Sequence, residues 1–438
     1  KAAKNLCAVL GQIDPDFVWQ SDSWDFGAVP SVWTPERIAK YFADLASEHA
    51  HMYMYDTCAE GNPFWNRTNY FGGIDWAFGI LHSFQGDDHL HGDLVRVSHS
   101  VRQAANDPGS THLKGLYHIP ESFGHNILYF QFTSSLAWNP DGIDVDIFLE
   151  HFCRTRYNAK SYDTMLECTR KVVEAVYSGG GTDMYYQRMG ITYNPPVAPP
   201  FDDYQAYVGR YTQVCSEVAL MEEAVTLALR AVRTERDNKL FENDLVVYAK
   251  TTLGLKSNYY LMEAYRAFKA GDAAGFDSSA VNALECLDGI QTILSTRPDY
   301  SLQKTIDDVM AIPGTNPYVP RMIRKHAVND MYAPVENYEQ LVLFYKPRVA
   351  AYLDEMRARL AKGVAEFRYG DAAPALNAIY NRWLDNECRV PEDLLFDGSP
   401  IDAVRAVYDC VPHAGIVGAS EQDLGTTKHA ECAKRERR

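Results

Sequence analysis

The first 140 residues alternate between short apolar runs and longer segments whose apolar residues recur at helical spacing. The short runs have the length and aromatic content of strands, and the segments between them are typical of amphipathic helices. Strands connected by helices form a parallel sheet. The predicted strands cover residues 16–24, 51–57, 76–84 and 113–120, and the predicted helices cover residues 33–50, 90–106 and 125–138.

The predicted helix over residues 33–50 carries the clearest local signals. Thr34 is a favourable N-cap residue, and Pro35 suits the first helical position because its fixed φ already matches a helix. Ile38, Phe42 and Leu45 follow at helical spacing. We therefore expect the helix to begin at Pro35 and to bury one apolar face.

After about residue 140 the pattern changes to long segments with apolar residues at helical spacing and few strand signals. This spacing predicts helices over residues 143–177, 204–235, 240–270, 275–295 and 302–311. We expect three parts: residues 1–140 as the C-terminal half of a (β/α)₈ catalytic barrel, residues 141–360 as an α-helical domain, and residues 361–438 as additional helices with a polar tail.

A tryptophan and three polar residues stand at or near the ends of the four predicted strands, namely Trp24, Asp56, His82 and Glu121. In a (β/α)₈ barrel the carboxyl ends of the strands carry the active site. Four strands are half of eight, so the fold class we predict is α/β plus all-α: the second half of a barrel followed by an all-helical domain. Half a barrel exposes unpaired strand edges, so we expect the N-terminal half of the same precursor, or a partner chain, to complete it.

Composition narrows the possible partners. The chain has 438 residues and a net charge of −16, which argues against nucleic-acid binding because phosphate neutralisation needs a basic surface. No stretch approaches the roughly 20 apolar residues of a membrane-spanning helix, so we expect no membrane partner. A homo-oligomer stays open.

Glu121 is the strongest candidate for chemistry. It follows an apolar run that ends in Pro120, within "GLYHIPESFGHN". A carboxylate at a barrel strand end can serve as a nucleophile or a general base. The alternative is an N-cap or surface acid in front of the next helix.

The other polar residues at the strand ends have two interpretations each. Asp56 and Glu60 could bind sugar hydroxyls, or either could form an internal ion pair with Arg67. His82 closes an apolar strand, where a histidine is more often a hydrogen-bonded core residue than a catalyst.

A metal site is not expected. His89 and His91 have the composition of metal ligands, but no matching distant ligand set is evident. We therefore predict neither a metal nor another cofactor. Asn66 begins a glycosylation sequon, Asn66-Arg67-Thr68, which favours a lysosomal or extracellular location.

Taken together, these features resemble the α-N-acetylglucosaminidase family, glycoside hydrolase family 89. The resemblance covers roughly residues 1–350, with the similar segments in the same order. The similar segments are "VWQSDSWDFGAVPSVW", "MYDTCAEGNPFWNRTNYFGG", "FGILHSFQGDDHLHGDL", "GLYHIPESFGHNILYFQFTSSLAW", "FCRTRYN", "NDLVVYAKTTLGLKSNYYLMEAYRAF", "LDGIQTIL" and "ENYEQLVLFYKPRV".

The resemblance implies a (β/α)₈ barrel followed by a helical domain, and retaining hydrolysis of terminal α-linked N-acetylglucosamine from glycans. It implies that Glu121 is the nucleophile. It further implies that Trp24, Phe84 and Tyr332 line the sugar pocket, where we also expect Asp56 and His82 to contact substrate.

The sequence departs from the family pattern in three places. The acid/base glutamate of the family would lie before Lys1, and "RMIRKHAVNDMY" lacks the tryptophan that the family places ahead of the tyrosine matching Tyr332. "LHSFQGDD" also differs from the Asn- and Gly-rich family version. These departures leave two alternatives: hydrolysis of a related α-linked sugar, or a non-catalytic carbohydrate-binding or structural relative.

Overall fold

The structure is a computed structural model. It describes residues 2–82, 90–120, 126–178, 204–329, 337–367, 369–385 and 389–410. These form two compact units. The sheet unit comprises the described parts of Lys1–Thr155 and Val176–Gln187, and the helical unit comprises those of Arg156–Ala175, Arg188–Asp330 and Glu336–Arg438.

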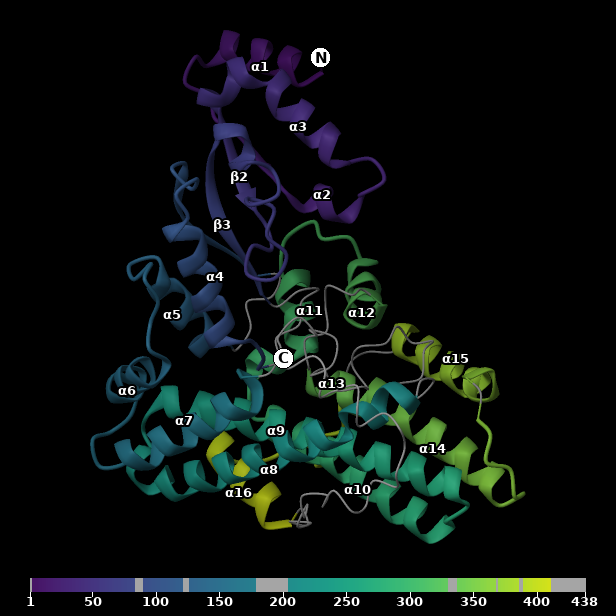
Figure 1. Ribbon diagram of the computed structural model, residues 1–438. Coiled ribbons are helices and arrows are strands. Elements are labelled where there is room, and N and C mark those ends of the chain that lie inside the picture. The colour runs from purple at the N-terminus through teal and green to yellow at the C-terminus, as the bar shows by residue number, and fades with distance from the viewer. Residues whose placement is uncertain are drawn as a thin grey trace. The chain divides into compact units, whose positions relative to one another are not determined.

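The sheet unit contains one four-stranded parallel sheet with the strand order β1-β2-β3-β4. Figure 1 labels β2 and β3 of this sheet. The predicted parallel sheet is therefore confirmed, and each strand pairs with the next strand along the chain. The strands are β1 (Trp19–Asp22), β2 (Met52–Asp56), β3 (Asp75–His82) and β4 (Leu113–Pro120).

The helices of the sheet unit largely follow the predicted pattern. Thr34 caps its helix as expected, because its hydroxyl accepts a hydrogen bond from the Arg37 N–H at 3.4 Å. The predicted helix over residues 33–50 is shorter, since the chain leaves α-helical geometry at Leu45 and continues as a 3₁₀ helix. The elements are α1 (Ala2–Ile13), α2 (Trp24–Ala28), α3 (Pro35–Asp44), η1 (Ala46–His51), η2 (Tyr70–Gly73), α4 (Leu94–Asn106), α5 (Ile127–Leu136) and α6 (Val145–Arg156).

The two faces of the sheet differ in burial. Met54, Trp76, Phe78 and Ile80 share one face and are completely buried. The opposite face carries tyrosines that remain half-buried, beginning with Tyr53 and Tyr55 on β2. A barrel sheet has this asymmetry, with an outer face under helices and an inner face toward the barrel axis.

The helical unit is built around α9, a 32-residue helix that is buried along most of its length and packs beside α8 and α10. The predicted helix over 143–177 is two helices, α6 and α7, because residues 157–161 form a turn in which the Asn158 N–H donates to Glu235. The elements of this unit are α7 (Tyr162–Val176), α8 (Tyr204–Glu235), α9 (Lys239–Ala270), α10 (Ala273–Leu294), η4 (Pro298–Tyr300), α11 (Leu302–Met310), α12 (Val319–Asn329), α13 (Tyr338–Gln340), η5 (Leu341–Tyr345), α14 (Lys346–Leu360), α15 (Tyr369–Asp385), η6 (Glu392–Leu394) and α16 (Pro400–Cys410). None of the described helices is both long and apolar enough to cross a membrane.

A buried ion pair anchors α9. The guanidinium of Arg156 donates two hydrogen bonds to the carboxylate of Asp244, at 2.5 and 2.6 Å, and the Tyr157 hydroxyl donates a third at 2.8 Å. Both charged side chains are only 9% exposed. Such a pair holds its geometry because separating the two charges would leave each of them desolvated and uncompensated.

Replacing Asp244 should therefore destabilise the chain strongly. We expect Asp244→Ala to lower the free energy of unfolding by about 3–5 kcal/mol, because Arg156 stays buried without a counter-charge. Urea unfolding measures this. The matched control is Asp308→Ala, which breaks the exposed Lys304–Asp308 pair and should change stability by less than about 1 kcal/mol. Equal effects of the two substitutions would contradict the argument.

Candidate functional site

The carboxyl ends of the four strands meet at one edge of the sheet, as they must in a parallel arrangement. Asp22, Asp56, His82 and Pro120 are the last residues of β1 to β4. Glu121 directly follows Pro120 in the sequence and lies outside the described residues, as do Phe84 and Tyr332. The candidate site is this edge together with the inner face of the sheet that leads up to it.

Three tyrosines cover the inner face. The rings of Tyr53 and Tyr55 lie 5.3 Å apart, and the ring of Tyr117 on β4 lies 4.4 Å from that of Tyr55. Burial raises the pKa of Tyr117 well above its usual range, and the nearby Asp56 and Asp22 add to the effect. The phenol therefore stays neutral, and its oxygen is itself buried. The cluster thus offers mainly aromatic rings, against which the apolar face of a sugar can pack.

Gly79 makes the contact between Tyr55 and Tyr117 possible. Those two tyrosines stand on β2 and β4, which are separated by β3, so Tyr117 must cross over β3 at Gly79. A Cβ atom at residue 79 would lie 2.6 Å from Cε1 of Tyr117 and 2.3 Å from the carbonyl oxygen of Asp56. Only glycine leaves enough room for this approach.

The sequence reasoning did not single out these tyrosines. The signal was present in the alternation Met52-Tyr53-Met54-Tyr55, in which the methionines are buried and the tyrosines half-buried. Such alternation separates the two faces of a strand. Finding Tyr117 as a neighbour of Tyr55 needed the register of three strands as well.

Asp56 is fully buried, and protein groups satisfy its carboxylate. It accepts hydrogen bonds from the Ser23 hydroxyl at 2.8 Å and from the N–H groups of Phe64 and Trp65 at 2.9 Å. Burial raises its pKa, and these hydrogen bonds oppose that shift. The carboxylate thus ties the segment after β1 and the loop after β2 to the end of β2. Its assignment as a substrate ligand stays a prediction.

His82 lies on the outer face of the sheet and is 3% exposed. Its ring stacks between those of Tyr129 and His91, at centroid distances of 4.0 and 4.2 Å. Its Nε2 contacts the side-chain amide of Asn126, whose oxygen accepts from the Tyr177 hydroxyl. The described surroundings therefore match those of a hydrogen-bonded core histidine, and a contact with substrate stays a prediction.

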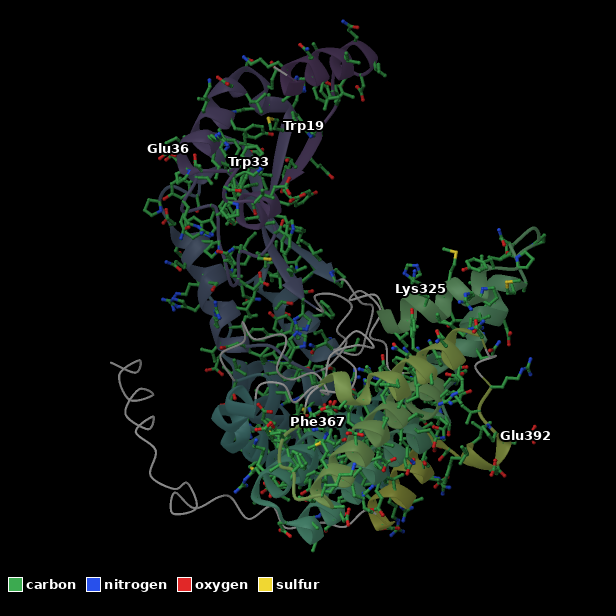
Figure 2. The ribbon with its side chains drawn as sticks, turned by 90° about the vertical axis from the view of Figure 1, so that its right-hand side faces the viewer. Trp19, Trp33, Glu36, Lys325, Phe367 and Glu392 are labelled. Carbon is green, nitrogen blue, oxygen red and sulfur yellow. The ribbon has the colours of Figure 1, made fainter. Side chains whose placement is uncertain are left out.

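Trp24 lies at the start of α2, two residues beyond β1, and is 42% exposed. Its backbone N–H donates to the Asp22 carboxylate at 2.9 Å, which fixes the backbone at this turn. An exposed indole at the carboxyl end of a strand is available to contact a ligand. Trp65 and Trp76 are core residues. Trp33, which is labelled in Figure 2, is half-buried against Phe26 and Tyr41.

Glu60 carries a strongly perturbed carboxyl group at this edge. Its Oε1 accepts from the Leu81 N–H at 3.0 Å, while its Oε2 is buried with no hydrogen-bond partner among the described residues. Burial raises its pKa to about 8. The carboxyl group lines a cavity of about 180 Å³ that is also lined by Cys58, His82, His91, Arg96 and Tyr129.

Three further features were considered from the sequence: an ion pair of Arg67, the glycosylation sequon at Asn66, and a metal site. Arg67 donates to the carbonyl oxygen of Pro63 at 2.6 Å and to the Asn62 side chain at 2.7 Å, and it forms no ion pair with Asp56 or Glu60 within the described residues. Asn66 is exposed. Within the described residues, no group of three His, Cys, Asp or Glu side chains could hold a metal ion.

Comparison with known proteins gives matches to both units. The family model for the α-N-acetylglucosaminidase (NAGLU) TIM-barrel domain matches residues 1–140, and that for the C-terminal domain matches residues 148–317. Human α-N-acetylglucosaminidase is 23% identical over 301 residues, which are 68% of this chain and 39% of the human protein.

Solved structures show the same fold. A family 89 glycoside hydrolase from Clostridium perfringens, in complex with PUGNAc, superposes with a TM-score of 0.69 at 15% identity, over 93% of this chain and 46% of that one. A doubly substituted variant of CpGH89 from Clostridium perfringens, in complex with its substrate GlcNAc-α-1,4-galactose, gives a TM-score of 0.64 at 15% identity, over 91% of this chain and 45% of that one. The chain thus spans less than half the length of these relatives.

These matches define the class: a glycoside-hydrolase TIM-barrel domain, contributing a parallel sheet, followed by a helical domain. The chain belongs to the α-N-acetylglucosaminidase family, glycoside hydrolase family 89. The predicted fold class is confirmed.

Gly79→Ala tests the packing of the inner face. We expect it to lower the free energy of unfolding by about 1–3 kcal/mol, because the new methyl group overlaps Tyr117 and the backbone of β2. Urea unfolding measures this, and near-ultraviolet circular dichroism reports the displaced tyrosines. The matched control is Gly115→Ala on the same face, where a Cβ meets no atom within 4 Å. It should be neutral or slightly stabilising, and an equal loss there would refute the steric argument.

Glu60→Gln tests the buried carboxyl group through pH. The unfolded chain releases this proton near pH 4.5 and the folded chain near pH 8, so its contribution to stability is fully present below about 4.5 and is lost as the pH rises to about 8. The neutral glutamine has no such loss. Relative to wild type, the variant should therefore gain stability between pH 5 and pH 8.5, by a few kcal/mol at most.

Urea unfolding at several pH values gives the curve for Glu60→Gln. The control is Glu36→Gln, because Glu36 is exposed and its own backbone N–H lowers its pKa. That variant should show no gain as the pH rises. A flat difference between Glu60→Gln and wild type would mean that Glu60 is ionised in the folded chain.

Proposed function

We propose that this chain is part of a retaining glycoside hydrolase that removes terminal α-linked N-acetylglucosamine, or a related α-linked sugar, from glycans, with Glu121 as the nucleophile. The observation that carries the proposal is the place of Glu121 in the sequence, directly after Pro120, the last residue of β4. Family membership supports it, since a family relative is solved with GlcNAc-α-1,4-galactose as its substrate.

In the proposed reaction the Glu121 carboxylate attacks the anomeric carbon, and the bond from that carbon to the aglycone oxygen breaks. A second carboxyl group protonates the departing oxygen. The same group then removes a proton from water, which attacks the glycosyl-enzyme and releases the sugar with retained configuration. This chemistry needs the two carboxyl groups about 5–5.5 Å apart.

We propose that another segment of polypeptide supplies the second carboxyl group by completing the barrel. Within the described residues β1 and β4 each have a partner strand on one side only. A closed barrel would pair both edges and would cover the tyrosine-lined inner face. The most economical source is the N-terminal half of the same precursor.

Within this proposal the inner-face residues shape the sugar site. Tyr55, Tyr117 and Trp24 supply aromatic surface against which the C–H face of a sugar can pack. Asp56 and His82 act as positioning residues, because Asp56 orders the loops beyond β1 and β2, and His82 joins the end of β3 to Asn126. Location in the lysosome or outside the cell, glycosylation at Asn66 and homo-oligomerisation stay predictions.

One observation favours a second candidate, a non-catalytic carbohydrate-binding or structural relative. The segment "RMIRKHAVNDMY" has no tryptophan ahead of Tyr332, whereas the resemblance implies one there. Such a relative would bind a glycan without turnover.

Glu121→Gln in the completed protein separates these candidates. We expect the rate of hydrolysis of nitrophenyl α-N-acetylglucosaminide to fall by at least about a thousandfold, since a neutral amide cannot form the glycosyl-enzyme. Circular dichroism and unfolding show whether the variant folds. Glu36→Gln, on the surface of α3, is the matched control and should keep wild-type activity.

A second measurement separates a nucleophile from a structural acid. In Glu121→Ala, added azide should restore turnover and should yield the β-glycosyl azide, because azide occupies the vacated position and attacks from the same side. Full activity of Glu121→Gln would refute the assignment. Glycan binding without turnover by the wild-type completed protein would favour the non-catalytic relative.

A further inference from the structure

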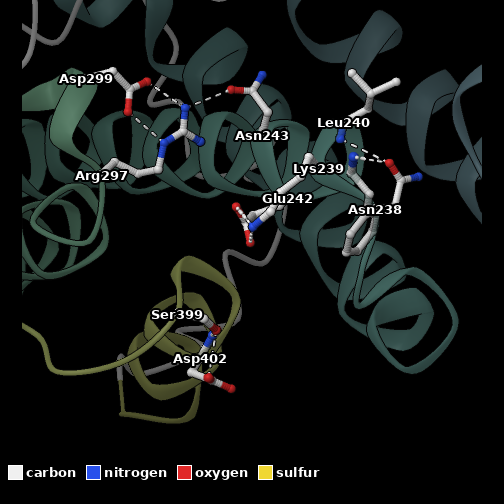
Figure 3. A network of polar contacts seen from close by, with 10 residues as sticks. Asn238, Lys239, Leu240, Glu242, Asn243, Arg297, Asp299, Ser399 and Asp402 are labelled. Atoms are coloured by element: carbon white, nitrogen blue, oxygen red, sulfur yellow. Dashed lines mark hydrogen bonds and ion pairs between the residues drawn. The ribbon is translucent and has the colours of Figure 1, made fainter.

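The helical unit has a hollow of about 560 Å³ between the end of α8, the start of α9 and the start of α16. It is independent of the strand-end site and of the proposed hydrolysis. Figure 3 shows part of its lining: Lys239 and Glu242 from α9, Ser399 directly before α16, and Asp402 in the first turn of α16. The side chains that matter for its charge are Arg230, Arg233, Arg236, Asp237, Lys239, Glu242, Asp402 and Arg405.

The hollow concentrates positive charge in a chain whose net charge is −16. Five cationic side chains line it against three carboxylates, which leaves a local excess of two positive charges. Lys239 is paired with Glu242 at 2.9 Å. Asp402 accepts from the Ser399 hydroxyl at 2.7 Å.

The four arginines, in contrast, have open hydrogen-bonding capacity. Within the part of the chain that the structure describes, the guanidinium groups of Arg230, Arg233, Arg236 and Arg405 make no hydrogen bond and no ion pair within 4 Å. Arg236 and Arg405 come from different segments, yet the charges of both lower the pKa of Asp402, after the larger effect of its hydrogen bond to Ser399. Their charges therefore act on the same small space.

The ends of helices explain only part of this cluster. Cations near the last turn of α8 are favourable because that end carries partial negative charge, which accounts for Arg233 and Arg236. It does not account for Arg230, a turn earlier, or for Arg405, in the middle of α16. Four guanidinium groups around one hollow repel one another, and the three carboxylates in the lining offset only part of this positive charge.

We propose that this hollow binds the doubly charged phosphate ester group of a small molecule. The guanidinium fork matches the oxygens of such a group and binds them in pairs. The local excess of two positive charges is balanced by a dianion, and a phosphate ester carries nearly that charge at pH 7. The volume accommodates the ester together with the small molecule that carries it.

Isothermal titration of the full chain with inorganic phosphate and, separately, with sulfate tests the proposal. Sodium chloride keeps the ionic strength constant, because unspecific attraction is screened by salt. We expect saturable binding with half-saturation below about 1 mM. Arg233→Gln and Arg405→Gln should each weaken it about tenfold, because each removes a charge-assisted pair of hydrogen bonds. Phosphate binding at least as tight as sulfate binding supports a phosphate ester, whereas binding of sulfate alone would contradict it.

The matched control is Arg382→Gln, an exposed arginine on α15 that has no hydrogen bond or ion pair within the described residues. It should bind the anion as wild type does. Thermal unfolding without anion should show that the two hollow variants are at least as stable as wild type, since the substitutions relieve repulsion. Non-saturating heat, or the same affinity in all of these proteins, would overturn the proposal.

Discussion

The carboxyl end of the sheet depends on the buried carboxylate of Asp56. A carboxylate is costly to bury, and here hydrogen bonds from one hydroxyl and two backbone N–H groups compensate most of that cost. The Ser23 hydroxyl that donates to it also accepts from the Thr57 N–H at 3.1 Å. The turn after β1 and the loop after β2 are thus held in one arrangement, and Trp24 and Glu60 take their places from these two segments.

This arrangement divides the strand-end residues by face. Asp56 and His82 point to the outer face, where helices and loops surround them, whereas Tyr55 and Tyr117 lie on the inner face. In a barrel enzyme the inner face and the loops beyond it meet the substrate. A polar residue at a strand end can therefore order the site without touching the sugar. Glu60 is a further residue of this kind, since its carboxyl group accepts a hydrogen bond from the Leu81 N–H and burial raises its pKa to about 8.

The helical unit contains two different kinds of charged group: a buried ion pair and a cluster of exposed arginines. Arg156 and Asp244 are buried together, with short hydrogen bonds that satisfy both groups. The arginines around the hollow of α8, α9 and α16 are exposed, and they have no ion-pair partner within the described residues. The buried pair contributes to folding, because removing either member leaves the other charge buried without a partner. A cluster of the second kind contributes little to folding, which is the physical reason to assign it to a ligand.

Periodicity was sufficient to predict the order of the strands and helices, because alternation and helical spacing are properties of neighbouring residues. It also indicated the strand ends as the site, since parallel strands place their carboxyl ends at one edge. The sequence by itself determined which residues stand at that edge, among them Trp24, Asp56 and His82, and that the helical segments follow the sheet. Only the tertiary structure decided the face on which each of them lies, that Tyr117 crosses Gly79 to reach Tyr55, and that arginines from α8 and α16 share one hollow. These facts depend on strand register and helix packing between residues far apart in the chain, which no local pattern encodes.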